Sequence, residues 1–178
     1  MGKQVKQNIY LLGPRACGKS TIGKIVAKKI GKNFVDLDVF ISKQEGKSIL
    51  DIIQNKGWNY FREIESKALF SFENKDNLVL ATGGGIILKE KNRVFLKSQK
   101  YTFYLKIDID TAIKRLLVSL DKENRPPLTN LSLEEEVKKV MQERENYYLE
   151  CARYIIDARQ LPEQIGEEIK RKIKNEWR

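Results

Sequence analysis

Five short apolar runs are spaced along the chain, and stretches with helical periodicity separate them. The runs are NIYLL (8–12), FVDLD (34–38), LVLAT (78–82), YTFYLKI (101–107) and RYIID (153–157). The helical stretches cover 21–30, 49–55, 88–97 and 110–117, and further helices begin at about 58 and at 132. Strands that alternate with helices predict right-handed crossovers and a parallel sheet.

The C-terminal third carries more local signals. Ser132 and Glu135 of SLEE match a capping box, which predicts the start of a helix. In the last predicted helix, Ile165, Ile169 and Ile173 fall on one face, with Glu and Lys elsewhere. By contrast, 119–130 (SLDKENRPPLTN) is charged, holds two prolines and has few apolar residues, which predicts a mobile loop.

Length and composition favour one globular domain, predicted to span residues 1–178. Of the 178 residues, 41% are hydrophobic, and no apolar run approaches the roughly 20 residues of a membrane span. The N-terminus lacks the apolar stretch of a signal peptide, so we expect a cytoplasmic protein. Cys17 and Cys151 have no metal-ligand spacing and suggest no disulfide framework.

The formal net charge of +10 admits three interpretations. The lysines are dispersed among acidic residues, which is typical of a solvated surface. A nucleic-acid-binding protein, or an enzyme that attracts polyanionic substrates, would also be basic. The chain has no histidine, so a general base would have to be a carboxylate, a lysine or a water molecule.

Residues 13–21 (GPRACGKST) match the phosphate-loop pattern G-x-x-x-x-G-K-[ST] between a predicted strand and a predicted helix. Backbone N–H groups of such a loop wrap phosphates, and the helix dipole favours their charge. Lys19 would reach the β- and γ-phosphates, and Ser20 would offer its hydroxyl to Mg²⁺. A chance match in a glycine-containing turn is the alternative. The motif does not identify the group that receives the phosphate.

Asp36 and Asp38 of DLD lie two residues apart in the predicted second strand, so both carboxylates should point the same way. At the carboxyl end of a central strand they would lie where open α/β sheets bind ligands. One could hold metal-bound water while the other accepts a proton from an attacking hydroxyl. Solvated acids at a strand end, one of them a helix cap, are the alternative.

Three charged residues on predicted helices suggest an anion site. Arg62 and Glu65 of FREIE are helical neighbours. They form either a surface ion pair or an arrangement in which Glu65 orients Arg62 toward an anion. Arg144 interrupts an apolar stripe, either as an anion ligand or as an arginine that covers apolar surface with its stem.

Gly83, Gly84 and Gly85 follow the third predicted strand and open a helix. We expect their amides to form a nest for an acceptor that bears a carboxylate. The missing side chains would let the ligand press against the backbone. A turn that requires glycine for steric reasons is the alternative.

In this order and spacing, GPRACGKST, DLD, FREIE, TGGG and RPPL resemble the shikimate kinase family over essentially the whole chain. The resemblance implies a P-loop, nucleoside-monophosphate-kinase-like α/β/α sandwich with a five-stranded parallel sheet in the order 2-3-1-4-5. It implies transfer of the γ-phosphoryl group of ATP to the 3-hydroxyl of shikimate, on the route to chorismate and aromatic amino acids. The implied ligands are ATP, Mg²⁺ and shikimate, without nucleic acid or membrane, and the implied state is a monomer.

The resemblance also implies roles for the matching residues. Lys19, Asp38 and the lid arginine Arg125 would be catalytic, and Ser20 and Asp36 would serve Mg²⁺. The lid would cover about 119–131 and bring Arg125 to the phosphates on closing. A substrate-binding segment of about 38–72 and its surroundings would hold the acceptor through Asp38, Arg62, Glu65, Gly83, Gly84, Gly85 and Arg144. ATP would be bound by Gly13, Pro14, Arg15, Ala16, Cys17, Gly18, Lys19, Ser20, Thr21, Arg115, Arg125, Arg159 and Pro162.

Two positions in the phosphate loop set this chain apart. Many family members have glycine where this chain has Ala16, and alanine restricts positive φ, which bears on nucleotide affinity. Cys17 lies at the N-terminal end of the following helix, where the dipole favours a thiolate. A reactive thiol that ATP and Mg²⁺ protect and a buried, inert thiol are the two hypotheses.

Other phosphate-binding families fit less well. Gluconate, adenylate and nucleoside kinases share the loop but do not need the combination of DLD, FREIE and three glycines. A GTPase would carry N-K-x-D, and NKDN (74–77) has asparagine where the base-reading aspartate belongs.

Overall fold

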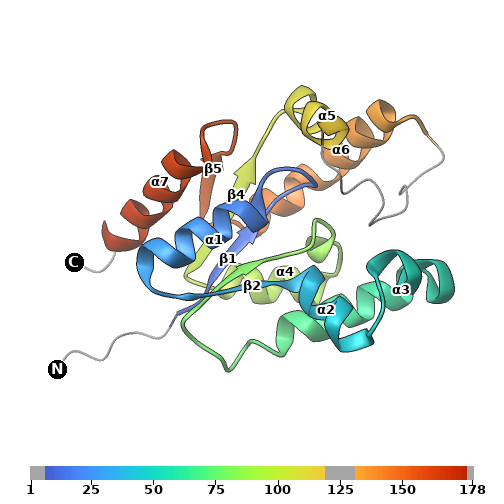
Figure 1. The fold of residues 1–178 in the computed structure, drawn as a ribbon, viewed down its shortest axis with the longest axis horizontal. Helices are drawn as coiled ribbons and strands as arrows, with labels where there is room; N and C mark the ends of the chain where they lie inside the picture. Colours follow the sequence, from blue (N-terminus) through green and yellow to red (C-terminus); the bar gives the residue numbers. More distant parts are fainter. Residues whose placement is uncertain (1–6, 119–130, 176–178) are drawn as a thin grey trace.

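The computed structural model of the protein describes residues 7–118 and 131–175. Five parallel strands form one sheet in the order β2-β3-β1-β4-β5 (Figure 1). The strands are β1 (Ile9–Leu12), β2 (Asn33–Asp36), β3 (Leu78–Ala81), β4 (Tyr101–Lys106) and β5 (Tyr154–Asp157). The predicted parallel sheet and its strand order are confirmed.

Helices cover both faces of this sheet. They are α1 (Lys19–Ile30), α2 (Leu37–Glu45), α3 (Ile49–Phe70), the 3₁₀ turn η1 (Ile86–Leu88), α4 (Glu90–Ser98), α5 (Ile109–Val118), α6 (Leu133–Cys151) and α7 (Pro162–Asn175). One core cluster takes residues from α1, α5 and α7, and the other from α2, α3, α4 and the C-terminal end of α6. The sheet lies between the two clusters, so the predicted three-layer α/β/α sandwich is confirmed.

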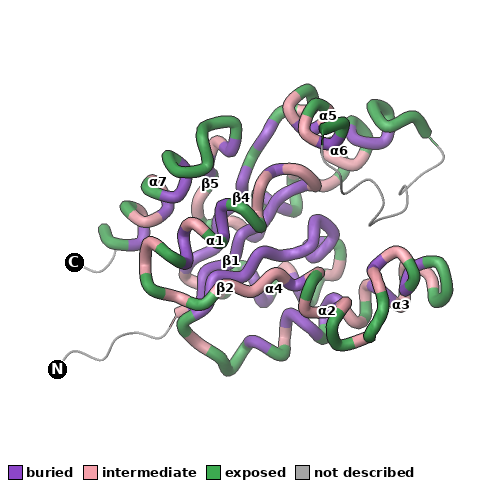
Figure 2. The backbone as a smooth tube through the Cα atoms, in the orientation of Figure 1, coloured by how far each residue is buried: buried purple, intermediate pink, exposed green. Residues whose placement is uncertain are grey.

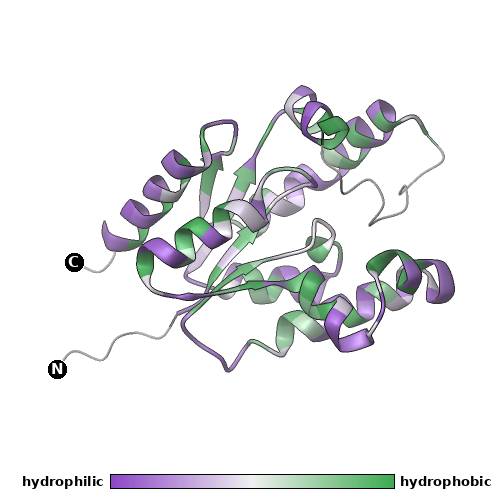
Figure 3. Cartoon of the chain, viewed as in Figure 1, coloured by the Kyte–Doolittle hydropathy of each residue, from purple (hydrophilic) through white to green (hydrophobic). Residues whose placement is uncertain are grey.

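The central strand β1 shows how the two clusters share the sheet. Ile9 and Leu11 belong to one cluster, and Tyr10 and Leu12 belong to the other. Successive side chains of a strand point to opposite faces, so a strand covered by helices on both sides is apolar at every position. This explains the continuous apolar run, which is buried in Figure 2 and hydrophobic in Figure 3.

Strand β2 ends earlier than predicted. Asp36 is its last residue, and Leu37 and Asp38 already belong to α2. The Asp36 carboxylate caps this helix by accepting hydrogen bonds from the N–H groups of Asp38 (3.0 Å) and Val39 (3.3 Å). The prediction that Asp36 and Asp38 share one face of a strand is therefore wrong, because the cap begins a helix between them.

Other helix boundaries follow their predicted signals. The Ser132 hydroxyl accepts a hydrogen bond from the Glu135 N–H, and the Glu135 carboxylate accepts one from the Ser132 N–H, which confirms the capping box. Gly57 breaks α3 with φ 79° and ψ 169°, between the two helices predicted there. Within the described residues, no helix has the length and apolar character needed to cross a membrane.

The apolar face of α7 is part of the core, as predicted. Ile165, Ile169 and Ile173 are each at most 1% exposed and share a cluster with α1. Ile169→Ala should lower the free energy of unfolding by about 2–5 kcal/mol, because it removes buried apolar surface and leaves a cavity. Urea denaturation measures the loss.

The matched control for this substitution is Ile155→Ala. Ile155 is 52% exposed on β5, so truncating it should cost less than about 1 kcal/mol. Equal losses for the two variants would mean that the α7 face contributes no more to stability than a surface side chain.

Candidate active site

A cleft of about 770 Å³ opens at the carboxyl ends of β1, β2 and β3. Its walls come from the phosphate loop, the first half of α2, the α2–α3 connection and the glycine loop after β3. The lining residues that were also predicted as site residues are Arg15, Ala16, Gly18, Lys19, Ser20, Thr21, Asp36, Asp38 and Gly84. The structure therefore brings the predicted phosphate, metal and acceptor residues to one edge of the sheet.

Lys19 and the phosphate loop form a closed unit. The Lys19 ammonium donates to the carbonyl oxygens of Gly13 (2.8 Å) and Pro14 (2.7 Å). The loop turns through positive φ at Gly13 (147°) and Gly18 (95°), and α1 starts directly after it. The N-terminus of a helix behind a glycine-rich turn binds anions through its free N–H groups and its dipole.

Ala16 occupies the left-handed region with φ 60°. For alanine this conformation costs about 1–2 kcal/mol. The Arg115 guanidinium donates to the carbonyl oxygens of Ala16 (3.3 Å) and Ala158 (2.8 Å), so it ties the strained turn to the residue after β5. In this structure Arg115 therefore stabilises the phosphate loop through its hydrogen bond to the Ala16 carbonyl oxygen.

The predicted metal residues form a direct contact. The Ser20 hydroxyl donates to Asp36 Oδ2 at 2.5 Å, while Oδ1 of the same carboxylate caps α2. A hydroxyl and a carboxylate beside a phosphate loop are the hard oxygen donors that Mg²⁺ prefers. Among the described residues, no cluster of three or more His, Cys, Asp and Glu could hold a metal ion by itself. A metal here would therefore need ligands from the nucleotide and from water.

Arg62 and Glu65 form a buried ion pair rather than a surface one. The Arg62 guanidinium lies 2.6 Å from Glu65 Oε2, and the Glu65 side chain is 1% exposed. Burial raises the pKa of the Glu65 carboxyl, and the nearby Arg62 and Arg144 oppose this shift. Trp58 and Phe61 flank the guanidinium, with ring centroids 5.1 and 5.2 Å from its carbon. The Arg62 guanidinium is therefore held in place by the carboxylate and by the two aromatic rings.

Two of the three glycines leave space for neighbouring side chains of the protein itself. A Cβ on Gly85 would collide with the Arg62 guanidinium, and one on Gly83 would collide with Glu65 Oε1 and lie 3.1 Å from Asp38 Oδ1. At Gly84 a Cβ would meet atoms of the phosphate loop at no less than 3.5 Å. That the three positions lack side chains to admit a ligand stays a prediction, and two of them have a further requirement that the sequence did not reveal. Gly83 and Gly85 make room for the Arg62–Glu65 pair.

Arg144 reaches the glycine loop from α6. Its guanidinium lies 3.4 Å from the Gly84 carbonyl oxygen, and burial lowers its pKa. Together with Pro14 and Arg15 it lines a hollow of about 40 Å³ next to the cleft. The inward placement that its position in the apolar stripe predicted is confirmed.

Sequence reasoning placed Tyr148 in the apolar stripe that Arg144 interrupts, but assigned it no role in the site. Its hydroxyl donates to the same Gly84 carbonyl oxygen at 2.5 Å, and its ring stacks on Tyr104 with centroids 5.0 Å apart. Tyr148 lies four positions after Arg144 on α6, so both residues share one face of the helix, and the hydroxyl of Tyr148 was the remaining signal of a polar role.

Several predicted residues lie elsewhere or take other partners. Arg159 pairs with Asp157 and Asp108 and has a side chain that is 58% exposed, and Pro162 begins α7. Cys17 is fully buried, which favours the inert thiol over the reactive one. Arg125 and residues 119–130 of the predicted lid lie outside the described residues.

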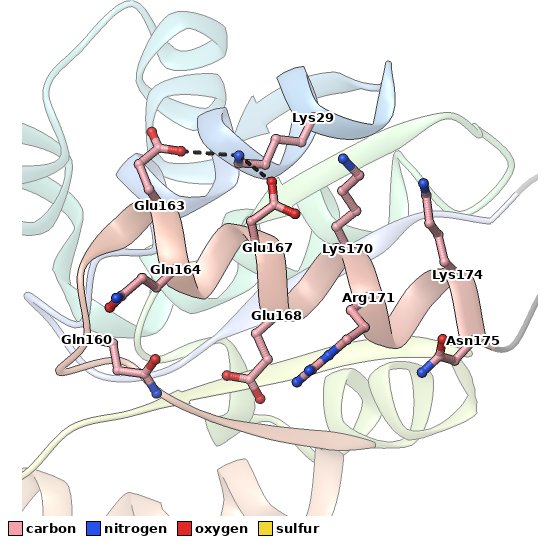
Figure 4. Close-up of a pocket in the computed structure, with 10 residues that line it drawn as sticks. All are labelled: Lys29, Gln160, Glu163, Gln164, Glu167, Glu168, Lys170, Arg171, Lys174 and Asn175. Carbon is pink, nitrogen blue, oxygen red and sulfur yellow. Dashed lines mark hydrogen bonds and ion pairs between the residues drawn. The ribbon is translucent and has the colours of Figure 1, made fainter.

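A second hollow, of about 1030 Å³, lies along α7 and has a different character (Figure 4). Charged and amide side chains border it, and Lys29 bridges Glu163 (3.3 Å) and Glu167 (2.6 Å) across the α1–α7 contact. Lys29 is thus paired with carboxylates, and no glycine is among the described residues that border this hollow. The phosphate-binding machinery therefore belongs to the first cleft.

Comparison with known proteins agrees with this geometry. Residues 15–174 match the family model described as shikimate kinase. Shikimate kinase 2 of Salmonella schwarzengrund is 41% identical over 163 residues, which cover 92% of this chain and 90% of the relative. Shikimate kinase 2 of Enterobacter sp. (strain 638) is 38% identical over 159 residues, which cover 89% and 91%.

Solved structures give the same answer. The shikimate kinase from Acinetobacter baumannii, in complex with shikimate, superposes with a TM-score of 0.89 at 32% identity, covering 97% of this chain and 95% of that one. A deoxyadenosine kinase from M. mycoides shares the fold alone, with a TM-score of 0.66 at 20% identity. The predicted fold and the predicted enzyme class, an ATP-dependent small-molecule kinase, are confirmed. The chain belongs to the shikimate kinase family.

Proposed function

We propose that the cleft transfers the γ-phosphoryl group of ATP to the 3-hydroxyl of shikimate, giving shikimate 3-phosphate and ADP, with the residues named below in their roles. The observation that carries this proposal is the buried Arg62–Glu65 pair beside a glycine loop that packs against the phosphate loop. A guanidinium held in one orientation recognises a carboxylate through paired hydrogen bonds, and shikimate has one carboxylate.

The donor side uses the phosphate loop. Lys19 exchanges its two loop carbonyls for the β- and γ-phosphates, and the residues of 13–21 hold the phosphates through their amides. Mg²⁺ is the proposed metal, held by Ser20 and, through water, by Asp36, because their oxygens are hard donors at the phosphate end of the cleft. Bound there, it would neutralise charge on the β- and γ-phosphates.

The acceptor side faces this loop across the cleft. Arg62, Arg144 and the Gly84 amide hold the carboxylate, and Glu65 keeps Arg62 oriented. Asp38, in the first turn of α2, binds the hydroxyls and accepts the proton of the attacking one. Arg125 is proposed to reach the phosphates from the lid, and Arg115, Arg159 and Pro162 are proposed to border the adenine.

The remaining expectations are also proposals. One chain carries both the donor and the acceptor residues, which supports a monomer as the active unit. Cys17 and Cys151 are buried free thiols, which suits the reducing cytoplasm. A basic nucleic-acid-binding protein is the rival, and it would bind DNA or RNA with steep salt dependence instead of turning over ATP.

ADP release tests the function directly. The protein should release ADP with ATP, Mg²⁺ and shikimate, and far less with gluconate, with AMP or without an acceptor. Lys19→Ala and Asp38→Asn should each lower turnover by at least about a hundredfold, because phosphoryl transfer depends on placed charges and a placed base. Circular dichroism should show an unchanged fold. Near-normal turnover of Asp38→Asn would exclude Asp38 as base and acceptor anchor.

Arg62→Lys should weaken shikimate binding by about tenfold or more while leaving ATP binding nearly unchanged. Lysine keeps the charge but loses the planar fork that a carboxylate accepts. Isothermal titration with each ligand separately measures both affinities. Equal losses for the two ligands would assign Arg62 a structural role.

Gly85→Ala tests the same contact without touching a charge. The new methyl group would displace the Arg62 guanidinium, so shikimate affinity should fall about as far as in Arg62→Lys. The backbone of Gly85 (φ −102°, ψ 3°) suits alanine, so the effect is steric. Gly31→Ala is the control for a general loss of stability. A φ of 68° strains alanine there, but its Cβ meets no atom within 4 Å. Unchanged shikimate affinity in Gly85→Ala would mean that the guanidinium is free to move.

A further inference from the structure

Tyr148 is buried next to the acceptor site and has no role in the reaction assigned above. Its side chain is 1% exposed, and its ring stacks on Tyr104 of β4 at an interplanar angle of 19°. Burial raises the phenol pKa of Tyr148, so the hydroxyl stays protonated at neutral pH and can donate a hydrogen bond. The donor is therefore permanent and fixed in place by the core.

The acceptor of this hydrogen bond is a buried backbone group. Gly84 lies in the glycine loop, and its carbonyl oxygen accepts from the Tyr148 hydroxyl at 2.5 Å and from the Arg144 guanidinium at 3.4 Å. These are the donors that reach it from the described part of the chain. The two distances are unequal, and the shorter one marks Tyr148 as the principal partner.

A buried carbonyl oxygen needs at least one donor, and leaving it without one is costly. If Arg144 were the only donor, one of its N–H groups would have to stay on the carbonyl, and the guanidinium could not turn freely to present a two-pronged face to a ligand carboxylate. With Tyr148 present, the carbonyl stays satisfied when Arg144 leaves. The guanidinium, which also contacts the Tyr148 hydroxyl, can then turn to a ligand without leaving the Gly84 carbonyl unpaired.

We infer that Tyr148 is a positioning residue for the acceptor: its hydroxyl satisfies the Gly84 carbonyl, so that Arg144 is released to bind the carboxylate of the substrate. The inference rests on the proposed function, since it takes Arg144 as a carboxylate ligand. It also assigns Tyr148 the placement of Gly84, whose Cα side packs against the phosphate loop near Gly13 and Arg15. Donor and acceptor walls then keep a constant spacing.

The substitution Tyr148→Phe tests this inference, because phenylalanine keeps the stacked ring and removes the donor. The dissociation constant of shikimate should rise about tenfold, which corresponds to about 1.4 kcal/mol, because Arg144 is then held by the carbonyl. The dissociation constant of ATP should stay within about twofold. Isothermal titration measures both.

Tyr147→Phe is the matched control. Tyr147 precedes Tyr148 on α6, and its side chain is 38% exposed with Arg93 over its ring, so deleting its hydroxyl should change neither affinity. In an Arg144→Ala background, Tyr148→Phe should have little further effect on shikimate affinity, because no guanidinium remains to be released. Structural loosening would instead add its full effect in both backgrounds.

The outcomes separate the inference from the function it rests on. If the unmodified protein releases no ADP with shikimate, the proposed function fails. If it does release ADP but Tyr148→Phe binds shikimate normally, loses both ligands equally or acts additively with Arg144→Ala, Tyr148 is a structural residue and the inference is overturned.

Discussion

The carbonyl groups at the carboxyl edge of the sheet set the constraint on which this site depends. Inside the sheet, backbone groups pair between strands, but the loops that leave the edge are buried without such partners. Side chains supply donors there: Lys19 for two carbonyls of the phosphate loop, Arg115 for a third and Tyr148 for Gly84. Loop geometry and charge placement are therefore determined by the same contacts.

This arrangement explains why the two halves of the cleft are close and rigid. The glycine loop packs directly on the phosphate loop at Gly84, so little room is left for relative movement. Arg62 and Glu65 occupy the space that side chains at Gly83 and Gly85 would fill. A buried ion pair is costly to leave incomplete, which fixes the guanidinium more firmly than a surface pair would. The guanidinium proposed to bind the acceptor is thus already held in one arrangement in this structure.

The sequence predicted the sheet because its signals are periodic and local. Continuous apolar runs and capping residues follow from strand burial and helix ends, and both survive in the structure. The strand containing Asp36 and Asp38 was predicted too long, because an aspartate that caps a helix cannot be distinguished by pattern from one within a strand. The reason for Gly83 and Gly85 was also missed, since it depends on Arg62 and Glu65, which are distant in sequence. Tyr148 looked like one more core aromatic on α6.

The resting partners of Lys19 have a consequence for how nucleotide affinity is measured and understood. In this structure the Lys19 ammonium already donates to two carbonyl oxygens, at 2.8 and 2.7 Å. If Lys19 binds the triphosphate as proposed, the two carbonyl oxygens around the ammonium would be replaced by anionic phosphate oxygens. The measured affinity for the nucleotide would then reflect the difference between these two sets of hydrogen-bond partners. Replacing Lys19 would remove its contacts with phosphate and also its two hydrogen bonds to the loop carbonyls. The loop of the variant would therefore differ in shape from the loop described here.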